Sequence, residues 1–167
     1  MTTQAPKQIA PRKLADYLEV MSKAVFQTGI SWRVVEAKWP GIREAFRGFE
    51  PKSVAAFGEA ELDALTNDTR VIRNRRKLEG IVKNARTILA LEKQHGSFRA
   101  YLRSHGGFEG TLKDMKKQFS FLGDMGAYYF LYVVGEEVPP HEEFGHERRR
   151  AGDGQAPSRS RAARSRG

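Results

Sequence analysis

The segment KDMKKQFSFLGDMGAYYFLYVVG, residues 113–135, determines how the rest of the chain is interpreted. A helical pattern ends there, a short turn with Gly123 and Gly126 follows, and an apolar helix is predicted over residues 127–134. Glycine lets a backbone approach another backbone or a phosphate closely, and the free amides at the start of a helix bind anions. The segment therefore predicts a helix-hairpin-helix that holds a phosphate without reading a base sequence. The alternative is an ordinary helical corner with a glycine cap.

On both sides of this segment, apolar residues recur at the three-and-four spacing of amphipathic helices, and no alternating strand pattern is found. A helix is expected from Leu14 to about Thr28, and Ser31 is expected to cap the next one. Pro40 is expected to open a separate helix, because proline suits a first helical turn. A further short helix is predicted to begin at Pro51, and others are predicted near residues 59–65, 74–94, 98–104 and 112–118. The prediction is an all-α fold, with one helix-hairpin-helix domain over residues 13–144.

The composition points to a basic protein with two unusual ends. The 167 residues carry a formal net charge of +9, which favours a polyanionic partner such as nucleic acid. Residues 145–167 hold seven arginines against two carboxylates and no aromatic or branched aliphatic residue, so we expect a disordered basic tail. Residues 1–12 are expected to be a flexible leader.

The absence of cysteine excludes disulfides, thiol catalysis and thiolate metal sites. The four histidines are scattered, so neither a metal nor another cofactor is expected. The sequence contains no run long enough to span a bilayer and no signal-peptide pattern, which predicts a cytoplasmic protein without a membrane partner.

Four segments carry a resemblance to a known family: QTGISW (residues 27–32), FRGFEPKSVAAFGEAELDAL (46–65), VIRNRRKLEGIVKNARTIL (71–89) and KKQFSFLGDMGAYYF (116–130). They resemble the DNA-3-methyladenine glycosylase I (Tag) family of the helix-hairpin-helix glycosylase superfamily. The resemblance implies a helical domain that binds double-stranded DNA in the minor groove, flips out a damaged base and cleaves its N-glycosidic bond. It implies base-excision repair of an alkylated purine by a monomer associated with the nucleoid.

The chain departs from that family at a decisive position. The resemblance implies a base-binding Glu eight residues before Trp32, where this chain has Ala24. The zinc site of the better-known branch is absent as well, since the chain has no cysteine. Three interpretations stay open: another carboxylate serves, with Glu36 and Glu142 as candidates; excision proceeds without one; or the chain is a non-catalytic DNA-binding or damage-sensing module. A helical protein-interaction domain is a more distant alternative.

The resemblance and the charge pattern name the remaining candidate residues. The expected base pocket consists of Ala24, Phe26, Trp32 and Tyr128. The expected DNA contacts are Ile30, Arg73, Arg75, Lys116, Lys117, Gly123 and Gly126. For the aromatic residues the alternative is a place in the core, and for the cations it is a solvated surface. A monofunctional enzyme that uses water is expected, because the segment after the hairpin has no Lys to form a Schiff base.

Overall fold

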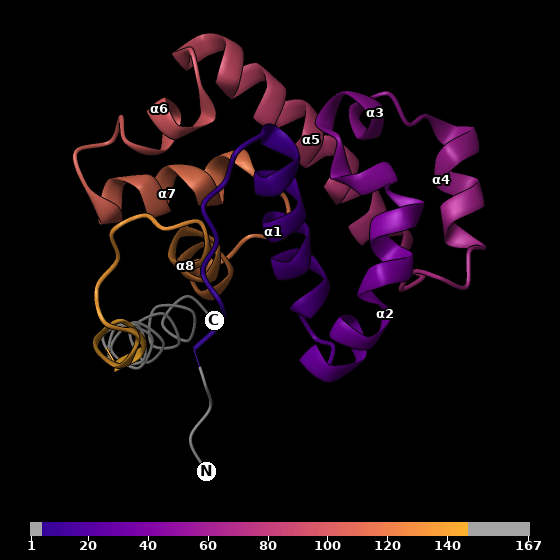
Figure 1. The fold of residues 1–167 in the computed structure, drawn as a ribbon, viewed down its shortest axis with the longest axis horizontal. Coiled ribbons are helices and arrows are strands. Elements are labelled where there is room, and N and C mark those ends of the chain that lie inside the picture. The colour runs from indigo at the N-terminus through magenta and orange to yellow at the C-terminus, as the bar shows by residue number, and fades with distance from the viewer. Residues whose placement is uncertain (1–4, 147–167) are drawn as a thin grey trace, which may run out of the picture. The chain divides into compact units, whose positions relative to one another are not determined.

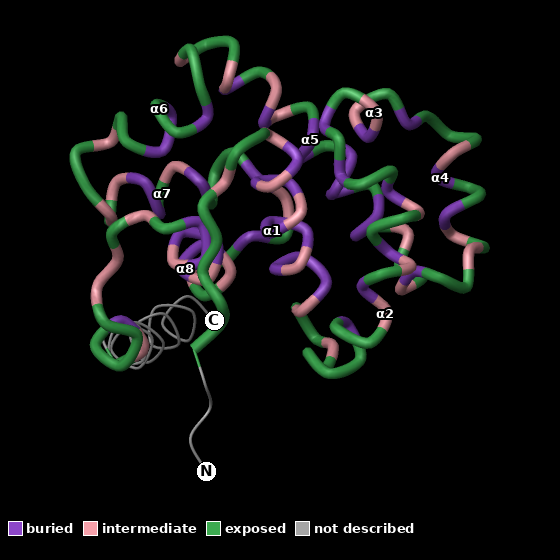
Figure 2. Tube along the Cα trace, in the orientation of Figure 1, coloured by how far each residue is buried: buried purple, intermediate pink, exposed green. Residues whose placement is uncertain are grey.

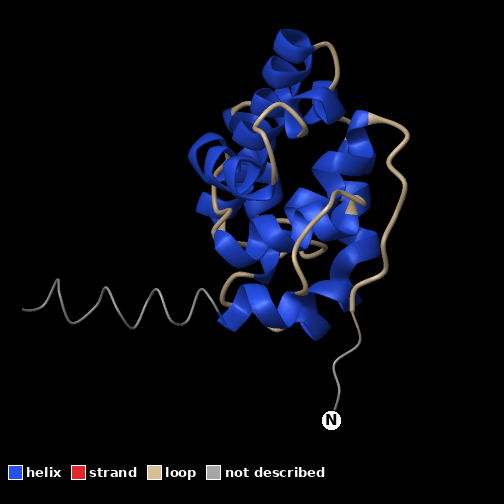
Figure 3. Ribbon diagram, turned by 90° about the vertical axis from the view of Figure 1, so that its left-hand side faces the viewer, coloured by secondary structure: helices blue, strands red, loops and turns tan. Residues whose placement is uncertain are grey.

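The computed structural model describes residues 5–146, and the chain divides into two compact units, residues 1–137 and 138–167. The elements of the first unit are α1 (Leu14–Gln27), α2 (Trp32–Ala45), the 3-10 turn η1 (Arg47–Phe49), α3 (Pro51–Ala55), α4 (Glu59–Thr66), α5 (Arg75–His95), α6 (Phe98–Leu102), α7 (Phe108–Gln118) and α8 (Asp124–Val133). In the second unit, residues 141–146 are helical. Residues 5–146 contain no strand (Figure 3), so the all-α prediction is confirmed.

Helix α1 lies at the centre of the first unit, between α8 and α5 (Figure 1), and it also contacts α2. Its side chains Leu18, Met21 and Val25 have no exposed surface. These residues follow the three-and-four spacing expected of a buried helix face, so the pattern along α1 is confirmed. Figure 2 shows the same alternation, with buried positions recurring along the helices and exposed positions between them.

Several helices begin where polar side chains satisfy the free amides of the first turn. The Asp16 carboxylate accepts hydrogen bonds from the amides of Arg12 and Lys13 at 2.8 and 3.2 Å. Asn74 Oδ1 caps α5, and Ser97 Oγ caps α6. Ser31 occupies the cap position of α2, but its hydroxyl makes no capping bond.

The prediction of a separate helix at Pro40 is wrong. Helix α2 runs unbroken from Trp32 to Ala45 with Pro40 inside it. Proline removes one backbone hydrogen bond from a helix interior. The buried side chains Val35, Trp39 and Ile42 lie on one face that continues past the proline. Packing of that face against the core therefore keeps the helix continuous.

The predicted helix, turn and second helix are present as α7, residues 119–123 and α8, but the second helix begins earlier than expected. Gly123 is the residue before α8, while Gly126 lies inside its first turn. The left-handed conformation in the turn belongs to Phe121, with φ of 58°. Only one of the two glycines therefore lies in the turn itself.

A close approach that requires glycine is found at Gly80 in α5. A Cβ atom added there would lie 2.8 Å from Cδ2 of the Phe121 ring. The ring of Phe121 thus rests against the backbone of α5, and this contact holds the hairpin turn in place.

The second half of the expected leader is bound to the domain. The Ile9 amide donates to the Val133 carbonyl at 2.8 Å, and Gln8 Nε2 donates to the Tyr132 carbonyl at 2.9 Å. Of the expected basic tail, residues 145 and 146 belong to the helix of the second unit. The rest of the tail lies outside the described residues.

Contacts of Asp114 at the corner between α6 and α7 should make the stability of the protein depend on pH. Tyr101 donates a hydrogen bond to Asp114 Oδ2 at 2.7 Å, and His105 Nε2 lies 3.3 Å from the same oxygen. Burial opposes ionisation of Asp114, but Tyr101 and His105 outweigh it and lower its pKa. The unfolded state then binds more protons, so this stabilisation is present above the unfolded pKa of about 3.9 and is lost as the pH falls through the folded value.

We expect Asp114→Asn to lower the free energy of unfolding by about 1–3 kcal/mol at pH 7, since a hydrogen bond to a charged group is lost. Denaturant titrations at pH 7 and pH 3 measure this effect, and the difference between the two proteins should be smaller at the lower pH. A difference that stays constant with pH would contradict the assignment.

Candidate active site and nucleic-acid interface

A groove with a volume of about 890 Å³ runs along the polar face of α1. Asp16, Glu19, Lys23 and Gln27 form its floor, three or four residues apart on that helix. The walls come from the start of α2, the end of α8 and the leader. Residues from elements far apart in the sequence therefore meet in one open site.

Three carboxylates line this groove, and two of them are already engaged. Asp16 caps α1, as described above. Glu19 Oε2 accepts a hydrogen bond from Trp39 Nε1 at 2.8 Å and lies 3.7 Å from Nε of Arg43. Glu36 makes no hydrogen bond or ion pair with the part of the chain that the structure describes. Glu36 is therefore the groove carboxylate available for a bound molecule.

Trp32 lies one helical turn before Glu36, so the two side chains are neighbours on one face of α2. The Trp32 side chain is 39% exposed and lines the groove. On the opposite wall, burial raises the pKa of Tyr129 to about 12, and a hydrogen bond from the Gln27 side chain partly offsets that effect. The Tyr129 hydroxyl is therefore protonated at neutral pH. An aromatic surface, a carboxylate and neutral polar groups face the same space.

The other three residues of the expected base pocket do not line this groove. Phe26 is fully buried, edge-on to Trp39 and Phe46. Tyr128 is buried beside the Phe108 ring.

Ala24 is 4% exposed and faces the first turn of α8. A Cβ atom added at Gly126 of that turn would lie 3.7 Å from the Cβ of Ala24. The side of α1 that carries Ala24 is thus occupied by α8, while the groove follows its polar side. Glu142, which was named with Glu36 as a candidate catalytic carboxylate, lies in the second unit.

The hairpin borders a shallow hollow of about 460 Å³ whose rim includes Thr28, Lys116 and Gly123. Two large apolar side chains on this rim face solvent, with Phe121 38% and Met125 48% exposed. Exposed apolar side chains beside free helical amides can contact a nucleic acid backbone and the wall of its groove. The sequence did not indicate these two residues. Phe121 lies in a turn and Met125 at the start of a helix, where the spacing of apolar residues gives no prediction of exposure.

The cations that were expected to contact DNA differ in whether a carboxylate of the protein already pairs with them. Arg75 donates hydrogen bonds to Glu59, Asp63 and Glu79, so three carboxylates already surround its guanidinium. Lys116 Nζ lies 2.6 Å from Asp124 Oδ1.

Arg73 and Lys117 are exposed and have no ion-pair partner among the described residues. Ile30 is half-buried in the turn between α1 and α2. The charges of Arg73 and Lys117 are therefore exposed to solvent and not held by a carboxylate of residues 5–146, a difference from Arg75 and Lys116 that charge patterning alone could not reveal.

Lys77 fixes the turn that carries Ile30. Its side chain is buried, and its ammonium donates a hydrogen bond to the Thr28 carbonyl at the end of α1. Burial lowers the pKa of Lys77. The candidate turn and the long helix α5 are thus joined by a side chain that was not a predicted site residue.

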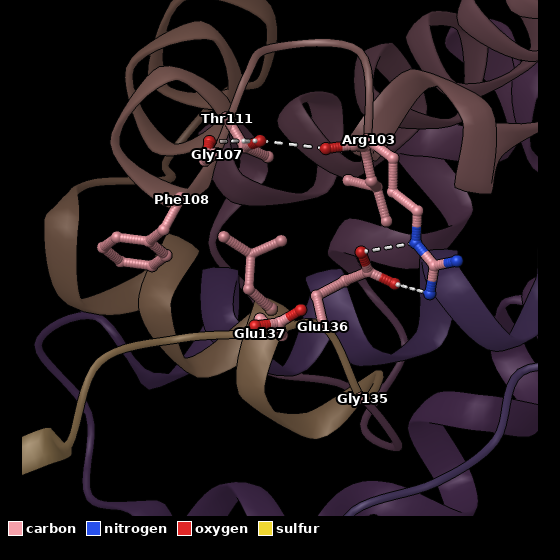
Figure 4. A pocket seen from close by; sticks show the side chains of 9 residues that line it. Arg103, Gly107, Phe108, Thr111, Gly135, Glu136 and Glu137 are labelled. Atoms are coloured by element: carbon pink, nitrogen blue, oxygen red, sulfur yellow. Dashed lines mark hydrogen bonds and ion pairs between the residues drawn. The ribbon is translucent and has the colours of Figure 1, made fainter.

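A further cavity of about 410 Å³ lies between the α6–α7 corner and the end of α8 (Figure 4). Arg103 Nε and Nη2 each lie 3.1 Å from a carboxylate oxygen of Glu136 in this cavity, and the Thr111 hydroxyl donates to Leu102 and Gly107 carbonyls. Arg103, Glu136 and Thr111 are thus already engaged within the protein, and none of the predicted site residues lines this cavity.

Neither a membrane span nor a metal-binding cluster is found in residues 5–146. No helix there is long and apolar enough to cross a bilayer. No three His, Cys, Asp or Glu residues of the same region are grouped so that they could hold a metal.

Comparisons with known proteins agree on one family. Residues 12–118 match the family described as methyladenine glycosylase. A DNA-3-methyladenine glycosylase from Haemophilus influenzae is 44% identical over 57 residues, which are 34% of this chain and 31% of that protein. DNA-3-methyladenine glycosylase 1 from Escherichia coli is 38% identical over 56 residues, 34% of this chain and 30% of its own length. The chain thus matches about a third of the length of these curated relatives.

A solved structure extends the similarity beyond these stretches. The 3-methyladenine DNA glycosylase I of Staphylococcus aureus, described for its recognition of 3-methyladenine, superposes with a TM-score of 0.67 at 26% identity. The superposition covers 77% of this chain and 80% of that one. The family match includes α1 to α7, and with them the floor of the groove, Trp32 and Glu36. The chain belongs to the methyladenine glycosylase family.

Proposed function

We propose that this protein releases an alkylated purine, of the 3-methyladenine kind, from double-stranded DNA by hydrolysis of the N-glycosidic bond. The observation that carries the proposal is the exposed Trp32 beside the unpaired Glu36 in the groove of a methyladenine glycosylase family member. A base flipped out of the duplex would stack on the indole ring, which tolerates any base with a π-face. The protein would act as a monomer in the cytoplasm, at the nucleoid.

Glu36 is the proposed carboxylate of the reaction. An alkylated purine carries positive charge and leaves readily, so C1′ of its sugar gains positive charge as the bond to the base nitrogen breaks. A carboxylate near that charge stabilises it. Water then attacks C1′, the base takes the electron pair of the broken bond, and the proton of the water passes to Glu36 and on to solvent. No covalent intermediate with the protein is required.

The proposed DNA contacts lie on the hairpin and beside it. The amides at the start of α8 would donate hydrogen bonds to a phosphate, with Gly123 leaving open space in front of them. Arg73 and Lys117 would bind neighbouring phosphates, and Ile30 would enter the stack that the flipped base vacates. These contacts position the duplex and read no sequence.

The substrate preference should follow from Ala24. A methyl group cannot accept a hydrogen bond from a base edge, so selectivity would rest on stacking and on the positive charge of the damaged base. N3- and N7-alkylated purines share these two features. We therefore expect both classes to be released, with little discrimination between them.

Incubation of the full chain with duplex DNA that contains N3- or N7-methylpurines tests the proposal. Free methylated base and abasic sites are expected products, measured by chromatography and by alkaline cleavage of the strand. Glu36→Gln should lower the single-turnover rate by about 10²–10⁴-fold, the usual range for a group that handles the proton. Glu92→Gln, which removes an equal charge from α5 outside the groove, is the matched control.

The outcomes separate the proposal from its main alternative. Release of base that depends on Glu36 supports the glycosylase. Tight binding of damaged DNA without release would instead support a non-catalytic damage-sensing module, which Ala24 favours because the family carboxylate is missing. Release that Glu36→Gln leaves unchanged would remove Glu36 from the mechanism.

A further inference from the structure

The start of α8 places backbone amides and a negative charge side by side. The amides that precede Ala127 have no carbonyl acceptor within the helix, since the first helical bond runs from the Ala127 amide to the Gly123 carbonyl. A Cβ atom added at Gly123 would have nothing within 4 Å, so the space before the helix is open. Asp124 occupies the first turn of the same helix. A phosphate that approaches these amides also approaches a carboxylate.

That carboxylate holds the nearest cation. Asp124 Oδ1 lies 2.6 Å from Nζ of Lys116, which stands in the last turn of α7 on the other side of the hairpin. The two side chains are 34% and 41% exposed, so their pair is accessible to a ligand. Lys116 lines the hollow beside the hairpin, together with Gly123. The lysine that could bind a phosphate at this point is therefore already paired.

We infer that Asp124 restrains the hairpin as a DNA-binding element by keeping Lys116 from the phosphate. Two like charges near one another repel, and a lysine shared with a carboxylate attracts a phosphate less than a free one. Undamaged DNA, which offers only backbone contacts, is bound weakly as a result. Damaged DNA has the additional contacts of the flipped base in the groove, so it remains bound when Asp124 lowers both affinities by the same factor. The inference rests on the proposed function of the chain as a DNA-binding member of its family.

The pair also explains why two basic residues at one hairpin need not act alike. Lys117 has no ion-pair partner among the described residues, whereas Lys116 has Asp124. An uncharged side chain at position 124 would free Lys116 without moving the backbone. Asparagine is the suitable replacement, because it has the shape of aspartate.

The test is the affinity of the full chain for a labelled undamaged duplex at several salt concentrations. Asp124→Asn should bind about threefold to tenfold more tightly at low salt. The plot of log affinity against log salt should become steeper by about one unit, as expected for one added phosphate contact. A purely structural role for Asp124 would not steepen that slope. Glu92→Gln, with the same change in net charge on α5, should stay within about twofold of the wild type.

A double-mutant cycle identifies the route of the effect. If Asp124 acts mainly by holding Lys116, then Asp124→Asn should bring a clearly smaller gain when Lys116 is already methionine, because only the direct repulsion between Asp124 and the phosphate is then removed. A gain of equal size with and without Lys116 would overturn the inference, as would equal gains for Asp124→Asn and Glu92→Gln.

The wild type separates failure of this inference from failure of the proposed function. If the wild type binds DNA and only the predicted gain is missing, the inference alone fails. If the wild type binds no duplex, both fail.

Discussion

Replacement of Trp32 by alanine should lower single-turnover release of a methylated purine by about 5- to 150-fold. Stacking of a base on an aromatic side chain contributes about 1–3 kcal/mol, and each 1.4 kcal/mol is a factor of ten. The indole ring is 39% exposed in the groove, so its removal creates no cavity in the core. The loss should therefore appear in binding and release of the base, while the free energy of unfolding changes by less than about 1 kcal/mol.

The neighbouring helix surface provides a matched control. Val34 is also a large exposed hydrophobic residue near the start of α2, but it does not line the groove. Val34→Ala should release the base at the wild-type rate. Equal losses in the two variants would show that the surface of α2, and not stacking in the groove, is responsible.

Replacement of Phe26 by alanine should lower the free energy of unfolding by about 3–5 kcal/mol, the usual effect of removing a buried aromatic side chain. Phe26 has no exposed surface, and its ring lies 6.1 Å from the ring centre of Trp39 and 6.4 Å from that of Phe46. Denaturant unfolding followed by circular dichroism measures the change. The expectation that Phe26 contacts the base predicts the opposite, a loss of base binding with normal stability.

A milder variant keeps the test decisive if the alanine protein does not fold. Phe26→Leu should still lower stability by about 1 kcal/mol, because a branched aliphatic side chain refills only part of the space. Its folded fraction should release the base with a normal single-turnover rate constant. A tenfold slower rate at unchanged stability would place Phe26 in the site.

Local features of the sequence were sufficient to predict most of the helices. The spacing of Leu18, Met21 and Val25 predicted the buried face of α1, and Ser31 predicted the start of α2. These features depend on residues within about one helical turn of each other, where the geometry of a helix is fixed. The exception was Pro40, because packing against the core outweighed its local preference to begin a helix.

The candidate site was only partly predictable, because residues from separate helices come together in it. Trp32 was named from the family resemblance and Glu36 as a substitute for the missing family carboxylate, and both line one groove. Gln27 and Tyr129, which face that groove from two helices, were not among the predicted site residues. Their proximity depends on how α1 packs on α8, and the positions of both residues in their own helices do not reveal it.

The sequence by itself thus determined the helical class, the approximate extent of the helices and the hairpin segment, because periodicity and capping act between near neighbours in the chain. Only the tertiary structure decided which charges are free. Arg75 is held by Glu59, sixteen residues away, and Lys116 by Asp124 across the turn. Such pairs form wherever the packing of apolar faces brings two side chains within hydrogen-bonding distance. A charge that seems available in the sequence can therefore be already neutralised in the fold, while that of Glu36 remains available to a ligand.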